Sequence, residues 1–557
     1  MSTDLDRRRL LASTAAVAAG AAVTATGIAA PAAAAPPARG AAARRRGQPA
    51  APADTASITV TPGDPRYGEL ITGVNQRWTG TPGRIYVARS TDDVVAAVTE
   101  TVRASRRLSI RSGGHCLAGL VFNPEVESVL DLSTFNGIGY DEGLNAFEVQ
   151  PGVILLNAYQ TLYKRWGVTI PGGFCYSVGA GGHVSGGGFG LLSRAHGLTV
   201  DHLYGVEVVV VDANGSVRVV TATRRADDPN RDLWWGYTGG GGGNFGVITR
   251  YWFRSPGATG SEPSRQLVNP PKEVLVSVVR VPWSALTADR FTALVRNVGT
   301  WYEANSAPDS PYTALSGSVS LNHVSAGAVT VLTQVDAAAP DARGLLDSYL
   351  ASVLAGTGVD PAALPAPLHL PWLRATILLG TGSAIGNNPA IRSDNHSAYL
   401  LKGFTDDQIS IIHRYLTSDR VSNHEAMVVL NPVGGRIGAV GPHDTAVAQR
   451  GAVLKALFQS LWTSPADDDA NIAWATGLYR EVYARTGNVP VPDDRTDGCY
   501  INYPDTAPLD DPKANTSGLS WHELYHKDNY PRLQQVKARW DPTDFFRHPL
   551  SVELPGR

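Results

Sequence analysis

Glycine is concentrated in two short stretches of this chain. Of 58 glycines in 557 residues, nine lie within residues 172–190 and seven within residues 236–246. A flexible linker would fill the intervening positions with polar residues such as Ser, whereas the first stretch interleaves glycine with Phe, Cys, Tyr, Val and His. Glycine adopts positive φ and lets backbone N–H groups converge on an anion. The two stretches therefore predict backbone packed closely against a flat, polar group.

Two other readings of the glycines compete with this one. A dinucleotide-binding turn places its glycines between a strand and a helix, but no clear helix follows Gly186–Phe189 in the sequence. A Rossmann-type nicotinamide site is therefore weakly supported. Glycines that only form sharp turns are the other alternative. A collagen helix is excluded, because no Gly-X-Y period occurs.

Charge and cysteine content narrow the classes of partner. The formal net charge is −2, but residues 1–46 carry seven Arg against two Asp, which makes that segment +5 and leaves −7 for the rest. An acidic body disfavours a phosphate backbone, so we expect no nucleic-acid partner. Three cysteines, Cys116, Cys175 and Cys499, form no disulfide framework, and no pair has zinc spacing.

The first residues have the features of an export signal. Asp6–Leu11 reads DRRRLL, a twin-arginine arrangement, and an Ala-rich run follows to about Ala30. A membrane anchor is the alternative, but Ala, Gly and Thr insert poorly beside Leu, Ile or Val. We expect a twin-arginine signal peptide over residues 1–35, then a disordered linker and N-terminal extension over residues 36–74.

Periodicity predicts a chain of mixed helices and strands in two lobes. In the first lobe, strands are expected at residues 84–89, 108–111, 129–132, 146–153, 206–211, 217–221 and 247–253, and helices at 91–106 and 153–166. After about residue 255, strands at 274–281, 312–321 and 426–430 alternate with helices at 288–302, 341–354 and 406–417. This second part predicts a sheet covered by helices. A last helix is expected at 531–539.

Four segments carry a resemblance to a known family. They are Arg111-Ser112-Gly113-Gly114-His115, the stretch 172–190 with Cys175, residues 241–248, and Asn502-Tyr503-Pro504-Asp505. In order and spacing they resemble the berberine-bridge-enzyme-like branch of the FAD-linked oxidases of the vanillyl-alcohol-oxidase type. The resemblance extends from about residue 77 to 552, and is strongest to bacterial members that oxidise secondary metabolites and carbohydrates.

The resemblance implies an α+β fold with a two-part FAD-binding domain of the PCMH type and an inserted substrate domain. The FAD-binding domain would span residues 75–255. The substrate-binding domain, an antiparallel sheet covered by helices, would span residues 256–495. The berberine-bridge-like C-terminal segment, residues 496–557, would return to the FAD-binding domain.

The resemblance also implies FAD held by two covalent bonds, from His115 to the 8α-methyl group and from Cys175 to C6. Imidazole is a nucleophile at neutral pH, and thiolate is a better one. An ordinary loop histidine and a buried free cysteine are the alternatives, and packing is what we expect of Cys116 and Cys499. Other expected FAD contacts are Arg111, Ser112, Gly113, Gly114, Val178, Gly179, Gly182, His183, Gly186, Gly188, Asn244, Gly246, Val247, Asn502 and Tyr503. A small residue such as Val178, three positions after the tethering cysteine, accompanies oxygen access in this family.

Oxidation of an alcohol needs a base for the hydroxyl proton. The resemblance assigns this role to Tyr503, with Tyr399 as its helper, and nearby Lys402 would favour the phenolate by charge. The alternative is that these tyrosines only pack, as most of the 20 in the chain would. Some relatives carry Tyr where Phe189 stands, which argues against a third catalytic tyrosine here.

His522-Glu523-Leu524-Tyr525-His526 matches the H-E-x-x-H pattern of zinc proteases. A third ligand would have to come from elsewhere, and only 31 residues follow the pattern. The segment also resembles the C-terminal part of the FAD-binding domain. We therefore expect no metal.

These observations predict a secreted FAD-dependent oxidase that converts an alcohol of a natural product or carbohydrate to a carbonyl and reduces O2 to H2O2. Two alternatives stay open: a flavoprotein that sequesters a drug-like metabolite for resistance, and an FAD-dependent dehydrogenase with a non-oxygen acceptor. The expected partners are the alcohol of a glycoside, sugar or polyketide, O2, and the twin-arginine export machinery. The expected form is a monomer or homodimer.

Overall fold

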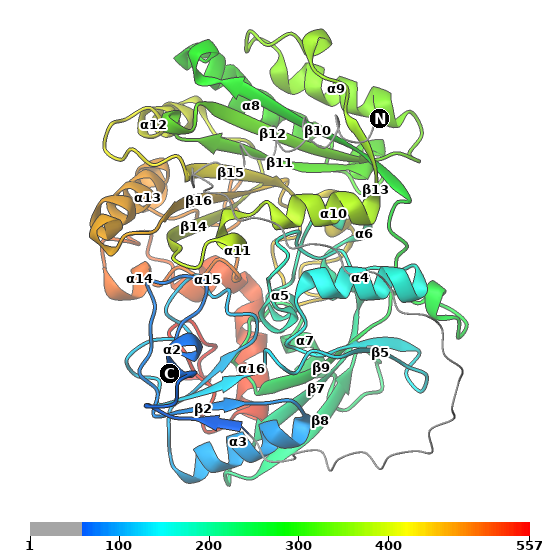
Figure 1. Cartoon of the computed structure of the whole chain (residues 1–557), viewed down its shortest axis with the longest axis vertical. Coiled ribbons are helices and arrows are strands. Elements are labelled where there is room, and N and C mark those ends of the chain that lie inside the picture. Colours follow the sequence, from blue (N-terminus) through cyan, green and yellow to red (C-terminus); the bar gives the residue numbers. More distant parts are fainter. Residues whose placement is uncertain (1–57, 557) are drawn as a thin grey trace, which may run out of the picture.

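Three β-sheets organise residues 58–556, the part of the chain that the computed structural model describes. Two of the sheets lie in one lobe and the third forms the core of a second lobe (Figure 1). The predicted signal peptide and most of the predicted linker lie outside the described residues. The described end of the N-terminal extension contains β1 (Ile58–Val60), which pairs with β2, and a short helix α2 (Tyr67–Leu70).

The first lobe contains a four-stranded and a five-stranded sheet. The four-stranded sheet has the order β1-β2-β4-β3, with β2 (Arg84–Val87) and β3 (Leu108–Arg111) each parallel to β4 (Ser128–Asp131). The five-stranded sheet is antiparallel and has the order β5 (Ile138–Asp141), β6 (Ala146–Val149), β9 (Val247–Phe253), β7 (Leu203–Val211) and β8 (Val217–Thr223). The helices of the first lobe are α3 (Thr91–Arg103), α4 (Leu155–Trp166), α5 (Ala180–Ser185), α6 (Ser193–His196) and α7 (Arg231–Gly236).

Helix α3 shows why a helix forms between two strands here. Ser90 caps it by accepting a hydrogen bond from Asp93 N at 3.1 Å. Val94, Ala97 and Val98 recur at helical spacing and are buried. The helix links β2 to β3, which are not neighbours because β4 lies between them.

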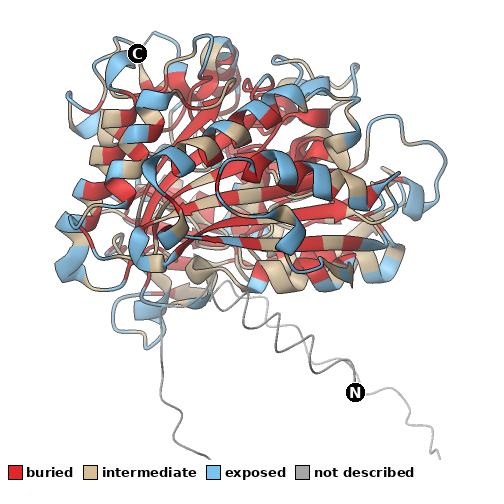
Figure 2. Cartoon of the chain, turned by 90° about the horizontal axis from the view of Figure 1, so that it is seen from above, coloured by how far each residue is buried: buried red, intermediate tan, exposed pale blue. Residues whose placement is uncertain are grey.

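The second lobe is built on a seven-stranded antiparallel sheet. Its order is β13 (Leu368–Pro371), β10 (Glu273–Pro282), β12 (Ala328–Asp336), β11 (Leu315–Asn322), β15 (Ala426–Pro432), β16 (Leu454–Trp462) and β14 (Arg392–Leu400). Helices α8 (Ala288–Ala304), α9 (Ala342–Leu354), α12 (Asp406–Leu416) and α13 (Asp468–Val482) cover one face. Figure 2 shows the buried strands beneath helices whose outer faces are exposed. Helices α10 (Trp372–Thr381) and α11 (Ala384–Asn387) lie toward the first lobe (Figure 1).

The C-terminal segment returns to the first lobe through α14 (Ala507–Asp510), α15 (Trp521–His526) and α16 (Tyr530–Trp540). Fully buried Lys537 on α16 donates to the carbonyl of Asn244 at 2.9 Å and pairs with Asp541 at 2.6 Å. The Asn244 side chain in turn accepts from Val552 N at 2.9 Å. The end of the chain is therefore bonded to the second glycine stretch.

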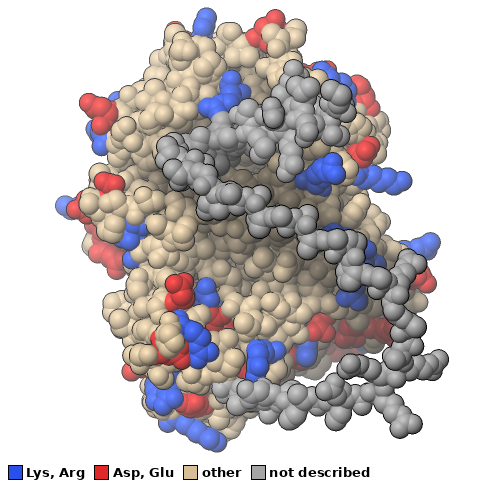
Figure 3. Space-filling model, viewed as in Figure 1, with Lys and Arg blue, Asp and Glu red and all other residues tan. Residues whose placement is uncertain are grey.

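The predicted α+β class, with an antiparallel substrate-lobe sheet covered by helices, is confirmed. Within residues 58–556, no helix combines the length and apolarity needed to cross a membrane. On the face of the molecule seen in Figure 3, acidic and basic side chains are intermixed around the edge of the view.

Candidate active site

A cavity of about 740 Å³ lies between the two lobes. Loops of the first lobe line one side of it, including both glycine stretches. The uncovered face of the seven-stranded sheet lines the other side, through β10, β11, β12, β15 and β16. A cavity of this size, with few converging polar groups, is typical of a ligand site.

The loop after β3 offers an anion site. Arg111 pairs with fully buried Asp131, and Ser112 Oγ donates to the carbonyl of Pro151 at 2.6 Å, so the start of the loop is held. Among the described residues, no acceptor faces the backbone N–H groups of Gly113, Gly114 and His115. Consecutive unpaired N–H groups in a tight loop form a site suited to a phosphate.

Glycine is required where this loop meets the first glycine stretch. The backbones of Gly113 and Gly179 approach so closely that a Cβ on either residue would overlap the N atom of the other. A Cβ on Gly186 would likewise overlap the side chain of Asn502. The contacts bring the loop that carries His115 against the loop that carries Cys175.

His115 and Cys175 both line the cavity, and Ser177 interacts with both. The distance from His115 Nε2 to Ser177 Oγ is 2.8 Å. Burial, together with the nearby charge of Arg111, lowers the pKa of His115 to about 4, so the imidazole is neutral at neutral pH. Burial raises the pKa of the Cys175 thiol, opposed by hydrogen bonds from Ser383 and Ser177. In the protein without FAD, Cys175 is therefore a protonated thiol and not the more nucleophilic thiolate.

His183 and Asn502 hold the loops in place. His183 Nε2 accepts a hydrogen bond from Gly173 N at 3.1 Å, and burial lowers the pKa of this histidine to about 4. Asn502 Nδ2 donates to the carbonyl of His183 and to Tyr500 Oη, both at 3.0 Å. The C-terminal loop with Tyr503 is thus bonded directly to α5.

A buried lysine lies against three aromatic rings beside the cavity. Lys455 Nζ is 3.1 Å from the ring centroid of Phe189, 3.8 Å from that of Tyr500 and 4.4 Å from that of Tyr503. Lys455 is fully buried, and its ammonium nitrogen has no hydrogen-bond partner among the described residues. Burial lowers the pKa of Lys455 well below its usual value, raises that of Tyr500 to about 12 and raises that of Tyr503. A protonated amine over the ring of Tyr503 favours ionisation of that tyrosine by charge.

Comparison with known proteins agrees with this geometry. Residues 82–221 match the family model described as an FAD binding domain, and residues 499–553 match the model described as berberine and berberine like. The chain is 48% identical over 508 residues to aclacinomycin-N/aclacinomycin-A oxidase of Streptomyces galilaeus, covering 91% of this chain and 92% of that protein. It is 31% identical to hexose oxidase of Chondrus crispus, covering 88% and 93%.

Solved structures agree as well. The crystal structure of aclacinomycin oxidoreductase superposes with a TM-score of 0.85 at 47% identity, covering 90% of this chain and 100% of that one. A glycopeptide hexose oxidase complexed with teicoplanin gives a TM-score of 0.84 at 44% identity, covering 89% and 99%. The chain belongs to the berberine-bridge-like family of FAD-linked oxidases. It is an FAD-dependent oxidoreductase.

The cavity fits the cofactor of this family. The open N–H groups of residues 113–115 suit a diphosphate, and the glycine contacts leave room for a planar ring against backbone. Arg111 Nε is buried and has no partner among the described residues, so it offers a further donor in the same loop. Of the predicted FAD contacts, fourteen line the cavity: Arg111, Ser112, Gly113, Gly114, His115, Cys175, Val178, Gly179, Gly182, His183, Asn244, Gly246, Asn502 and Tyr503.

The other predicted residues lie away from the cavity. Gly186 lies under Asn502, and Gly188 lies against Thr199 and His183. Val247 begins β9 and packs into the core beneath α3. These three residues shape the loops and do not line the cavity.

Tyr399 and Lys402 also lie away from the cavity lining. Tyr399 is buried and packs edge-on against Tyr500, with ring centroids 5.9 Å apart, and Tyr500 in turn packs against Tyr503 at 5.1 Å. The helper role of Tyr399 stays a prediction. The prediction for Lys402 is wrong: this lysine is half-exposed and pairs with Asp494 at 2.7 Å. Lys455, opposite Tyr399 on the neighbouring strand, supplies the amine instead.

The sequence held one signal for Lys455. Strand β16 reads LKALFQSLW, so Lys455, Leu457 and Gln459 share one face of a strand whose remaining polar residue is Ser460. A polar residue at every fourth position of a buried strand indicates a face that meets a site. The strand itself was not predicted, and neither was the short helix α5 inside the first glycine stretch.

The H-E-x-x-H segment serves the fold in this family member. Ser520 and Glu523 form a capping box at the start of α15. His522 stacks on Tyr530 with ring centroids 3.9 Å apart, and His526 is buried. In the described residues, no group of three His, Cys, Asp or Glu is placed to hold a metal ion.

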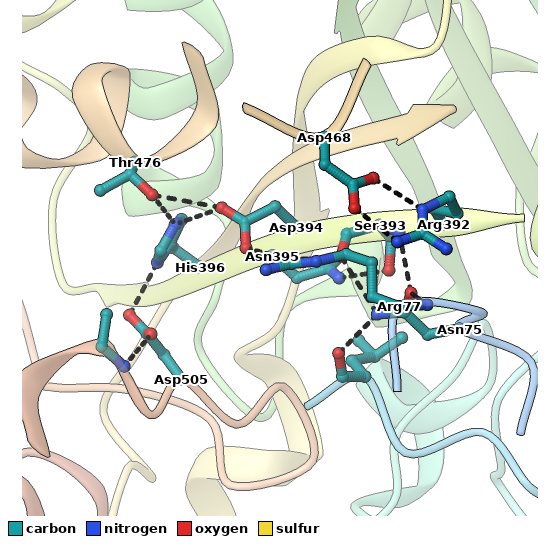
Figure 4. A network of polar contacts seen from close by, with 12 residues as sticks. Asn75, Arg77, Arg392, Ser393, Asp394, Asn395, His396, Asp468, Thr476 and Asp505 are labelled. Carbon is teal, nitrogen blue, oxygen red and sulfur yellow. Dashed lines mark hydrogen bonds and ion pairs between the residues drawn. The ribbon is translucent and has the colours of Figure 1, made fainter. Parts of the chain in front are cut away.

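A charged network fixes the loop that carries Tyr503 (Figure 4). His396 on β14 lies between two carboxylates, with Nδ1 2.7 Å from Asp505 and Nε2 3.1 Å from Asp394. Arg77, from the N-terminal segment, donates to Asp394 at 2.8 Å. Asp505 lies two residues after Tyr503, so the network joins the N-terminal segment, the second lobe and the C-terminal loop.

When His396 is protonated, its positive charge attracts the carboxylates of Asp394 and Asp505. Burial opposes the charge, but Asp505 and Asp394 outweigh it and raise the pKa of His396 to about 10. An unfolded histidine has a pKa near 6.5. Because the folded state holds the proton more tightly, the stabilisation is complete below about pH 6.5 and is lost as pH rises through about 10.

We predict that His396→Gln removes this pH dependence. In the wild type, the thermal midpoint should fall steadily between pH 7 and pH 10, because over that range the unfolded state has lost its proton while the folded state still binds it, at a total cost on the order of a few kcal/mol. The variant should be less stable at pH 7 and show a flatter decline in the same thermal scans. His369→Gln, at an exposed histidine paired with Glu273, is the matched control. Equal slopes in the wild type and His396→Gln would contradict the protonated assignment.

Proposed function

We propose that this enzyme oxidises an alcohol group of a carbohydrate or natural product to a carbonyl, with O2 reduced to H2O2. The observation that carries the proposal is the amine of Lys455 buried against Tyr503, beside a cavity that His115 and Cys175 also line. The names of the relatives support it, since aclacinomycin oxidase acts on a natural product and hexose oxidase on a sugar.

FAD would be held by the loops of the first lobe. The N–H groups of residues 113–115 would bind its diphosphate, and His115 and Cys175 would each form a covalent bond to its ring system. Bound FAD supplies hydride acceptance and the transfer of electrons to oxygen. The neutral imidazole of His115 supports the first tether. Cys175 lines the same cavity, and hydrogen bonds from Ser383 and Ser177 partly offset the burial that raises the pKa of its thiol.

Tyr503 and Lys455 would act together on the substrate proton. A phenolate alone and an ammonium alone are both disfavoured in this buried place, as their opposite pKa shifts show. With both charges present, the cation lies against an anionic ring and each stabilises the other. The two groups therefore hold protons as a coupled pair, with Tyr503 facing the cavity to receive the hydroxyl proton.

Val178 would leave room for oxygen. It lines the cavity three residues after Cys175, and it is only partly buried. A branched three-carbon side chain occupies less of the cavity than Leu or Ile at the same position would. This supports an oxidase over a dehydrogenase with a different acceptor.

We predict that Tyr503→Phe leaves flavin bound but lowers the rate of flavin reduction by roughly 10²–10⁴, the usual worth of general-base help. Lys455→Met should lower it by roughly thirtyfold, since a desolvated cation–π contact contributes about 2 kcal/mol. Lys455→Met should also move the pH–rate profile to higher pH, because Tyr503 would ionise without a neighbouring cation. Stopped-flow reduction without oxygen measures both effects.

The substrate for these measurements comes from a peroxide-release screen of hexoses and polyketide glycosides. Lys402→Met is the matched control for Lys455, because Lys402 lies outside the cavity lining, and it should retain wild-type rates. Undiminished reduction by Tyr503→Phe would exclude this residue as the base. Fast reduction with slow reoxidation in air would identify a dehydrogenase instead.

We predict that the flavin stays with the protein after acid precipitation. The wild-type pellet should be yellow, His115→Ala and Cys175→Ala should each keep one bond, and the double variant should release its flavin to the supernatant. Mass spectrometry of tryptic peptides identifies each attachment point. Release of all flavin by either single variant would contradict attachment at two residues.

We also propose export through the twin-arginine route, supported by the DRRRLL segment near the N-terminus. In a host with this machinery, peroxide-producing activity should collect in the medium. Replacing Arg7 and Arg8 together by Lys should keep the enzyme inside the cell, whereas replacing Arg44 and Arg45 by Lys should not. Unchanged export in a host without the machinery would overturn the assignment.

A further inference from the structure

One carboxylate lines the cavity. Among the described residues that surround it, Glu425 is the single acidic side chain. It comes directly before β15, and Leu461 N donates to its carbonyl at 3.3 Å, so the strand pairing continues through this residue. Its neighbours along the strand that also line the cavity are Met427, Val429 and Asn431. This alternation places all four side chains on the face toward the first lobe.

Glu425 lies far from the reacting end of the cavity. Asn431 is paired with Lys455 across the sheet, and Lys455 contacts Tyr503. Asn431 lies six positions after Glu425, which corresponds to roughly 20 Å along an extended strand. A molecule that touches both Tyr503 and Glu425 must therefore be longer than a single sugar ring.

The carboxylate of Glu425 has no hydrogen-bond or ion-pair partner among residues 58–556. Burial raises the pKa of Glu425 to about 7, and no neighbouring charge opposes this effect. Two lining groups on the paired strands, Asn322 and Gln459, stand opposite Met427 and are uncharged. His424, directly before Glu425, also lines the cavity. Arg280 also lines the cavity, but it is exposed and donates to the carbonyl of Ala326 at 3.4 Å.

We propose that Glu425 is a specificity residue that binds a protonated amine at the far end of an elongated alcohol substrate, about 20 Å from the hydroxyl group that is oxidised. The inference rests on the proposed function for the identity of the oxidised end. A half-buried carboxylate without a partner is costly, and a cationic group from the ligand removes that cost by forming a charge-assisted hydrogen bond. A neutral hydroxyl would do so less well, because it brings no charge.

The position of Glu425 predicts how the amine acts. The residue is too remote to touch the reacting carbon, so the amine should strengthen binding of the substrate and its transition state equally. Such uniform binding lowers KM and leaves kcat unchanged. The preference should depend on length, because a short ligand that reaches Tyr503 cannot also reach Glu425.

The test uses ω-aminoalkyl glucosides with linkers of increasing length, each compared with its N-acetyl derivative. The N-acetyl form carries no charge and is larger by the acetyl group, so the wild-type difference is compared with the difference in Glu425→Gln. Titration calorimetry with the wild-type holoenzyme should show tighter binding of the amine by about tenfold to a hundredfold at the longer lengths. In Glu425→Gln, the amine and the N-acetyl form should bind alike, and in Glu425→Lys the amine should bind more weakly than the N-acetyl form.

Glu262→Gln is the matched control, because Glu262 is an exposed carboxylate that does not line the cavity. Its amine preference should equal that of the wild type. An amine preference that persists in Glu425→Gln, or that is absent from the wild type at every length, would overturn the proposal. Binding that shows the preference without any peroxide release would count against the proposed oxidation and still support the role of Glu425.

Discussion

The site depends on a contact made without side chains. Gly113 and Gly179 bring two loops together backbone to backbone, and any larger residue at either position would overlap the other loop. Because of this contact, the loop of His115 and the loop of Cys175 face the same cavity, with Ser177 between the two reactive side chains. The clustered glycines of this chain therefore serve mainly to let backbone segments pack closely, and only some of them are needed to form turns.

Buried charged side chains hold the C-terminal segment and the Tyr503 loop to the rest of the structure. Lys537 bonds the C-terminal return to Asn244, and His396 with Asp505 bonds the Tyr503 loop to the second lobe. These two cations are fully paired, so they stabilise the arrangement they connect. Lys455 has no such partner and meets only aromatic rings. The difference separates a structural cation from one whose charge is available for chemistry.

The first lobe was largely predictable from local patterns. Strand β9 spans the predicted residues 247–253, and the loop of residues 111–115 was recognised because glycine and histidine are adjacent in sequence. The second lobe was less predictable, since β14 and β16 contain polar residues that break the apolar pattern of a buried strand. Those same polar residues, His396 and Lys455 among them, face groups brought there by other segments. The pairing of Lys455 with Tyr399 joins positions far apart in sequence, which is why the sequence indicated Lys402, close to Tyr399 along the chain, and not Lys455.

The same limit explains why the sequence of this protein predicts its reaction class better than its substrate. The reacting groups lie on loops whose residues are contiguous, so short segments identify them. Substrate contacts lie on alternate positions of several strands, where Glu425, Asn322 and Gln459 become neighbours only through the register of β11, β15 and β16. Changing alternate residues on one sheet face alters what the cavity admits without disturbing the buried face beneath it. A fold of this kind can keep one chemistry while the length and charge of its substrate change.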